Sequence, residues 1–429
     1  MAGAGTRRRA AGRPLFYGWV VVGGAFAILF AAYGAQYAFG VFFAALIDEF
    51  GWSRASLAGA FSLYTFVYCG CALVTGRLTD AWGPRAVIAA GGLFLGLGLT
   101  SMSGAREIWH PYVLYGVVAA LGMSAAYVPC TATVARWFVR RRGLAIGAAS
   151  AGMGLGTFAL PPAAQFLVSH VGWRWAYAIF GVGILVSLNL VATVMRRDPE
   201  SLGLRPDGES VHTGAAPSRG REAAWTVSEA VRTRSFWVLF ALFGTTWVPI
   251  FVPLVHLVPM ARGRGVSPLA AATLMSALGL AAVAGRFLMG AASDRVGRRP
   301  TLAVALALQV AAFIALAHAS SLAAMYAAAL LFGFSYGGVS VMFPSMVADF
   351  FGREHAGSIV GVLFATAGGL TAWGPTAAGW IYDRYGSYDP AWWLSAGFNA
   401  LALGVLVFAR PPAAAPDRRA LLDPSRRVG

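Results

Sequence analysis

Lysine is absent from this 429-residue chain, and acidic residues are scarce, with 17 Asp and Glu against 33 arginines. Charged residues make up 12% of the sequence, whereas an ordinary soluble protein carries about 25%. So little charge excludes a water-soluble globular fold and a disordered chain. The net charge of +16 would suit a nucleic-acid-binding protein, but here the arginines separate long apolar runs, as they do in membrane-protein loops. We therefore expect no nucleic-acid partner.

Cysteine is also rare. Cys69, Cys71 and Cys130 all lie in apolar stretches, and residues two apart on a helix point in different directions. The sequence thus predicts buried small hydrophobic side chains here, without a disulfide or metal framework. No cluster of His, Cys and Asp has metal-ligand spacing, no nucleophile has an adjacent base, and we expect no metal, no cofactor and no enzyme activity.

Long apolar runs make up most of the sequence. About 20 mostly apolar residues are needed to cross a bilayer, and twelve stretches qualify. The first follows Arg7, Arg8 and Arg9 but is too long for the apolar region of a signal peptide, so we expect it to be retained. The twelve predicted spans are 16–47, 55–77, 84–103, 110–138, 143–168, 173–195, 235–260, 268–292, 300–319, 322–351, 356–382 and 389–410.

A polar stretch, 196–234, separates the sixth span from the seventh. Its prolines, glycines and seven arginines predict a flexible cytoplasmic linker between an N-terminal half (1–195) and a C-terminal half (235–410), with a cytoplasmic tail at 411–429. If the N-terminus is cytoplasmic, 26 of the 33 arginines fall in cytoplasmic segments and 6 in outer loops. This asymmetry predicts a multi-pass protein with both termini in the cytoplasm, and we expect a bacterial inner membrane.

Two short loops repeat each other. The segments 76–85 and 290–299 both fit G-x-x-x-D-x-x-G-x-R at an offset of 214 residues, and Val128-Pro129 recurs as Phe343-Pro344 at an offset of 215. The predicted fold class is therefore an all-α membrane protein with twelve transmembrane helices in two pseudo-symmetric six-helix halves. In each loop the Asp can sit at a helix end and pair with an Arg across the halves. We expect Asp80, Arg85, Asp294, Arg298 and Arg136 to gate the conformational change.

Twelve spans in two related halves, with this loop in both, resemble the major facilitator superfamily. The segments YGWVV at 17–21 and RWFVRRRGLAIG at 136–147 resemble its monocarboxylate transporter and oxalate–formate antiporter branch. The resemblance implies alternating access by rocking of two halves about a central site. It also implies a carboxylate-binding Arg on the eighth span and cavity-lining tyrosines on the fourth and tenth.

Arg286 is the arginine inside a predicted span. A charge at the bilayer centre costs about 2.5–3.5 kcal/mol on insertion scales, and Ala282 and Gly290, four residues away, offer no carboxylate. A cation without a partner on its own helix suits an anion, so we expect Arg286 to bind substrate. The alternatives are an ion pair with another span or a tether between the halves. No span interior carries Asp or Glu, which an exporter of cations or basic drugs usually carries.

Aromatic residues with polar tips are expected to complete the pocket. On the resemblance, Tyr127 and Tyr336 would orient a carboxylate. The first span adds Tyr33, Gln36 and Tyr37 as candidate lining residues, with ordinary packing as the alternative for each.

His256 lies in an apolar stretch of the seventh span. It could carry a coupled proton, because an unperturbed His titrates near 6.5, or it could be a neutral hydrogen-bonded residue.

These residues and the resemblance predict a monomeric secondary transporter that moves small monocarboxylates, such as lactate or pyruvate, and the resemblance implies that a proton is coupled to this transport. The dicarboxylate branch is expected to carry a Lys on the eleventh span, and 356–382 has no basic residue, which favours one carboxylate over oxalate. The alternatives are an oxalate–formate-type anion exchanger, a drug or metabolite exporter, and a receptor that does not transport.

Overall fold

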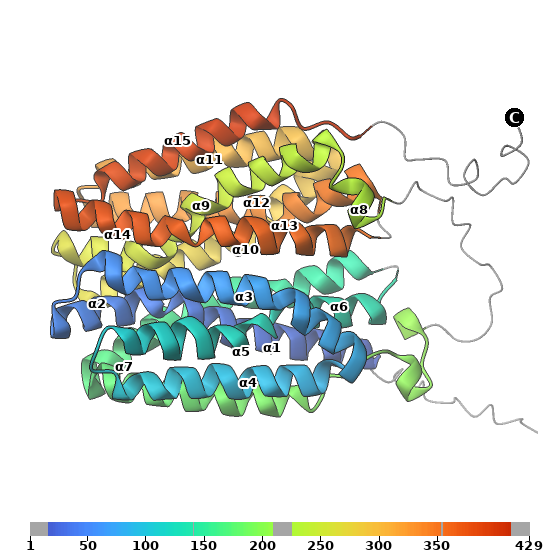
Figure 1. Cartoon of the computed structure of the whole chain (residues 1–429), viewed down its shortest axis with the longest axis horizontal. Helices are drawn as coiled ribbons and strands as arrows, with labels where there is room; N and C mark the ends of the chain where they lie inside the picture. Colours follow the sequence, from blue (N-terminus) through green and yellow to red (C-terminus); the bar gives the residue numbers. More distant parts are fainter. Residues whose placement is uncertain (1–15, 140, 209–224, 353–354, 413–429) are drawn as a thin grey trace, which may run out of the picture.

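The computed structural model describes residues 16–139, 141–208, 225–352 and 355–412, and all regular structure within them is helical. Helices from the first part of the chain gather in one bundle and those from the second part in another, and the two lie side by side along the long axis (Figure 1). The all-α prediction is confirmed.

The N-terminal bundle comprises α1 (Tyr17–Tyr37), α2 (Phe39–Phe50), α3 (Arg54–Trp82), α4 (Pro84–Ser101), η1 (Met102–Gly104), η2 (Pro111–Ala119), α5 (Ala120–Ser124), α6 (Tyr127–Trp137) and α7 (Arg142–Ala192). The C-terminal bundle comprises α9 (Arg234–Gly263), α10 (Pro268–Val296), α11 (Arg298–His318), α12 (Leu322–Phe351), α13 (Ala356–Thr371), α14 (Trp373–Tyr385) and α15 (Asp389–Leu406). In the chain, the two bundles are connected by a segment with the short helices η3 (Glu200–Leu202), η4 (Pro206–Gly208) and α8 (Val227–Ala230).

Ten helical segments in the described parts of the chain are long and apolar enough to cross a membrane, and they fall on the predicted spans. The longest, 143–192, covers the predicted span 143–168 and most of 173–195. Gly172 divides it, because its φ of 78° breaks the helical backbone. The last predicted span corresponds to the 18-residue helix α15. Together these elements account for all twelve predicted spans.

The repeated loops adopt the same backbone. Gly83, between α3 and α4, has φ 85° and ψ 161°, and Gly297, between α10 and α11, has φ 96° and ψ 158°. A residue with a Cβ rarely adopts such values, so each motif needs glycine at this position. This one-residue turn lets α4 follow α3, and α11 follow α10, without a longer loop.

The outer surface of the bundles is apolar. Leu97, Val186, Leu288 and Trp373 are large hydrophobic residues with 46% to 71% of their surface exposed. Contiguous exposed apolar surface of this kind is unfavourable in water and favourable in lipid. The chain is therefore a multi-pass membrane protein. Part of the predicted linker (209–224) and most of the predicted tail (413–429 of 411–429) lie outside the described residues.

Candidate functional site

Arg286 lies on α10, where this helix meets α12 of its own bundle and α7 of the N-terminal bundle. Its Nε donates to Ser340 Oγ on α12 at 3.3 Å, and its Nη1 donates to the Ser150 carbonyl oxygen on α7 at 3.3 Å. Glycine allows α12 to approach α10 closely, since a Cβ at Gly337 on α12 would lie 2.1 Å from the Ala282 carbonyl oxygen on α10. The guanidinium thus sits at the interface between the bundles.

The Arg286 guanidinium has no carboxylate partner among the described residues. Within the same residues, both N–H groups of Nη2 lack an acceptor. A guanidinium presents its donors in a planar fork that matches a carboxylate. The predicted ion pair with another span is therefore not seen, whereas contact with both bundles is.

Four of the predicted site tyrosines form a connected series that ends at Arg286. The Tyr127 and Tyr33 rings are 6.5 Å apart, and Tyr33 and Tyr37 are 5.9 Å apart. The Tyr37 and Tyr336 hydroxyls share a hydrogen bond of 3.1 Å, and the Arg286 Cζ lies 5.9 Å from the Tyr336 ring centre. The structure therefore brings together residues from α1, α6, α10 and α12 that are far apart in the sequence.

Gln36 lies beside this series on α1. Its side chain is 1% exposed, and neither amide atom has a hydrogen-bond partner among the described residues. Residues three or four apart share a helix face, so Gln36 shares its face with Tyr33. Leaving such a group unpaired costs about 1–3 kcal/mol, which is expected where a ligand supplies the missing partner.

Sequence reasoning missed Trp247 on α9. Its ring packs 6.3 Å from Tyr336, and its buried indole N–H has no acceptor among the described residues. Ser340 was also missed. No signal would have found them, because a Trp or Ser in an apolar span is ordinary until its neighbours are known.

The comparisons with known proteins agree with this architecture. The family model described as Major Facilitator Superfamily matches residues 25–371 and 250–424. The chain belongs to the major facilitator superfamily, in its monocarboxylate transporter family. It is a transporter and not an enzyme.

Its relatives cover most of the chain. It is 30% identical to "Monocarboxylate transporter 3" of Rattus norvegicus over 412 residues, covering 94% of this chain and 82% of the relative. It is 28% identical to "Monocarboxylate transporter 12" of the same organism, covering 91% and 85%. A solved bacterial homologue of the human lysosomal transporter Spinster has the same fold, with a TM-score of 0.73 at 15% identity over 93% of this chain and 97% of that one.

In this family member, His256 lies away from the tyrosine series. It is fully buried on α9, with Nδ1 2.9 Å from the Tyr388 hydroxyl and Nε2 2.8 Å from the Pro375 carbonyl oxygen. A carbonyl can only accept, so Nε2 carries a proton, and when the ring is neutral Nδ1 accepts from Tyr388. Burial raises the pKa of the Tyr388 hydroxyl, which keeps this donor protonated. The proton-coupling role stays a prediction, and this geometry favours the structural alternative.

The loop motifs pair within each bundle. Arg136 forms an ion pair with Asp80. Arg298 contacts Asp294 at 2.7 Å and Asp349 at 3.5 Å. The expected pairing across the halves is therefore wrong for the described residues in this conformation, because each acid lies nearer to an arginine of its own bundle.

Arg85 is exposed on α4 and has no hydrogen bond or ion pair among the described residues. The gating role of these loop residues stays a prediction.

The bundles are instead joined at the opposite end. Asp383 on α14 accepts hydrogen bonds from the backbone N–H groups of Arg54 at 3.0 Å and Ala55 at 2.8 Å, at the start of α3. Arg262 on α9 pairs with Asp48 on α2 at 2.8 Å. A carboxylate from one bundle thus caps a helix of the other, which closes this end.

Proposed function

We propose that this protein is a secondary active transporter of small monocarboxylates, such as lactate or pyruvate, driven by a coupled proton. The observation that carries the proposal is Arg286, a guanidinium between the two bundles with free donors and no carboxylate partner among the described residues. Monocarboxylate transporters among the relatives support the substrate class. The absence of a basic residue in 356–382 supports one carboxylate group in preference to two.

In the proposed mechanism, Arg286 neutralises the carboxylate with its planar fork of donors. The hydroxyls of Tyr127 and Tyr336 orient the substrate, and Gln36, Tyr33 and Tyr37 line the remaining wall. Binding of the anion offsets the cost of a partly buried, partly unpaired cation. The loaded site can then be occluded, and the two bundles, which we take as the moving halves 1–195 and 235–410, rock about it.

The decisive experiment is uptake of labelled lactate into proteoliposomes by Arg286→Ala and Arg286→Lys. Hydrogen bonds to a charged group contribute about 1.5–3 kcal/mol, so we expect Arg286→Ala to lower uptake by roughly 10- to 150-fold. Arg286→Lys keeps the charge but loses the fork and should retain part of the activity. Arg295→Gln, at the exposed end of α10, serves as the control. Normal uptake by folded Arg286→Ala would remove this mechanism.

The same vesicles distinguish a proton symporter from an anion exchanger, and cells that express the protein identify an exporter. A proton symporter accumulates lactate when the outside is acidified, whereas an anion exchanger shows counterflow that does not depend on pH. An exporter of amphipathic compounds would confer resistance whether or not Arg286 is present.

A further inference from the structure

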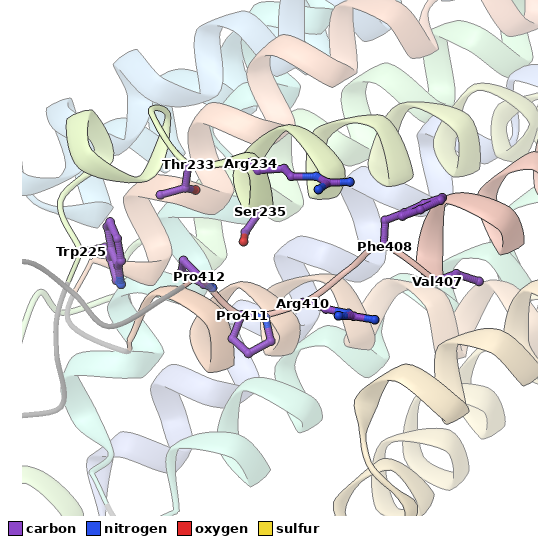
Figure 2. Close-up of a pocket in the computed structure, with 9 residues that line it drawn as sticks. All are labelled: Trp225, Thr233, Arg234, Ser235, Val407, Phe408, Arg410, Pro411 and Pro412. Atoms are coloured by element: carbon purple, nitrogen blue, oxygen red, sulfur yellow. The ribbon is translucent and has the colours of Figure 1, made fainter.

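A cavity whose lining includes none of the candidate site residues lies where the C-terminal bundle begins and ends. It has a volume of about 620 Å³ and is lined by residues at the start of α9 and after the end of α15, with Trp225 alongside (Figure 2). The backbone N–H of Trp225 donates to the Phe351 carbonyl oxygen at 3.0 Å, which ties this wall to the end of α12. The cavity thus lies at the boundary between the spans and the arginine-rich end of the molecule.

The cavity is cationic. Arg234 and Arg410 line it, both are exposed, and neither guanidinium has a hydrogen bond or ion pair with any described residue. No acidic side chain is among its described lining residues. Arg234 is also the first residue of the 30-residue helix α9, whose N-terminal end carries a partial positive charge. Two free guanidinium groups beside such an end are suited to a phosphate-like anion.

An apolar groove continues from this cavity along the lipid-facing surface between α9 and α15. The groove has a volume of about 300 Å³ and shares Arg234 and Phe408 with the cavity. Trp237 and Phe408 expose 54% and 59% of their surface, and Ala241 lies farther along the groove. A charged cavity that opens into an apolar groove matches an amphipathic ligand, with an anionic head and an apolar chain.

We propose that this site binds an anionic phospholipid, with the phosphate held by Arg234 and Arg410 and an acyl chain lying along the groove. Basic pockets between helices at the membrane boundary recognise such head groups. The site is separate from Arg286 and does not depend on which substrate is transported. On the proposed orientation, the lipid belongs to the cytoplasmic leaflet.

The test measures binding of phosphatidylglycerol and phosphatidylcholine to the purified full chain by native mass spectrometry. Each basic residue near an anionic lipid contributes about 1 kcal/mol, which corresponds to roughly fivefold in affinity. We expect Arg234→Gln with Arg410→Gln to weaken phosphatidylglycerol binding by about 30-fold. Arg295→Gln removes an exposed arginine at the same end of the molecule, outside this cavity, and should leave binding unchanged.

A second variant tests the apolar part. Ala241→Trp fills the groove and keeps both arginines, so it should also weaken phosphatidylglycerol binding, whereas Ala327→Trp on the exposed face of α12 should not. The proposal is overturned if the double Arg variant binds phosphatidylglycerol like the parent, or if phosphatidylcholine binds equally well. Protection of the parent from thermal unfolding by inorganic phosphate alone, at the level that phosphatidylglycerol gives, would also overturn it, because a free anion would then suffice.

Discussion

At the scale of single residues, Gln36 offers a test that separates function from stability. A buried amide without partners destabilises the fold by about 1–3 kcal/mol, and both amide atoms of Gln36 are in this state among the described residues. Gln36→Leu keeps a similar volume and removes the unpaired groups. We therefore expect it to raise the thermal unfolding midpoint and to lower lactate uptake, both measured on the purified protein.

Gln309 on α11 provides the matched control. It is fully buried, and its amide is likewise unpaired among the described residues, but it lies on α11, which supplies none of the site tyrosines. Gln309→Leu should raise the unfolding midpoint without changing uptake. If Gln36→Leu transports normally, its amide has no part in binding.

His256 leads to a prediction about pH. Its ring donates to the Pro375 carbonyl and accepts from Tyr388, and a Gln side chain can also donate and accept. If the role is structural, His256→Gln should keep the pH dependence of uptake, with at most a loss of stability. Uptake by the parent and the variant, measured between pH 5 and 8, decides the point. A flat profile in the folded variant would restore His256 as the proton carrier.

The sequence shows Arg286 but not its partners. A lone charge in an apolar run is costly and stands out by itself. The carbonyl of Ser150 accepts from Arg286, and a backbone acceptor has no signature because every residue carries one. For the same reason, the partner of Asp383 could not be predicted, since it caps backbone groups 328 and 329 residues away.

At the scale of elements, the cap between α14 and α3 predicts how one end of the transporter opens. Asp383 satisfies two backbone N–H groups that α3 cannot satisfy itself. Loss of a helix cap costs about 0.5–2 kcal/mol. Asp383→Ala should therefore shift the ratio of open to closed states at this end by roughly 2- to 30-fold.

Spin labels at the exposed residues Arg106 and Arg384, one on each bundle, measure this change. In Asp383→Ala we expect a larger population of molecules with a long distance between the two labels. Asp389→Ala is the control, because Asp389 pairs with Arg264 inside the C-terminal bundle at 2.6 Å. An unchanged distance distribution in Asp383→Ala would show that the cap does not hold the closed end.

The helices themselves could be predicted closely, and their ionic contacts could not. The predicted span 322–351 coincides with α12, because hydrophobicity sets the length of a span. The ion pairs formed by the two repeated loops differ, although both loops fit the same motif. In one repeat the loop supplies the acid, Asp80, to Arg136 on α6, whereas in the other it supplies Arg298 to Asp349 on α12.

At the scale of the whole molecule, the two bundles touch along their length but are tied most firmly at one end. Asp383 and the Arg262–Asp48 pair join them there. Near the middle, Ser276 on α10 donates to the Phe158 carbonyl oxygen on α7 at 2.6 Å. The proposed site between the two bundles, with one end joined by a few polar contacts, is the arrangement that the proposed rocking requires.

The arrangement of arginines predicts the orientation of the whole molecule. Positively charged loops stay in the cytoplasm, and 26 of 33 arginines lie in the segments assigned to that side. Fluorescent-protein fusions after Trp82 and Arg410 should therefore fluoresce in bacterial cells, and an alkaline phosphatase fusion after Ala105 should be active. The reverse pattern would invert the molecule, place the Asp383 cap on the cytoplasmic side and move the proposed lipid site to the outer leaflet.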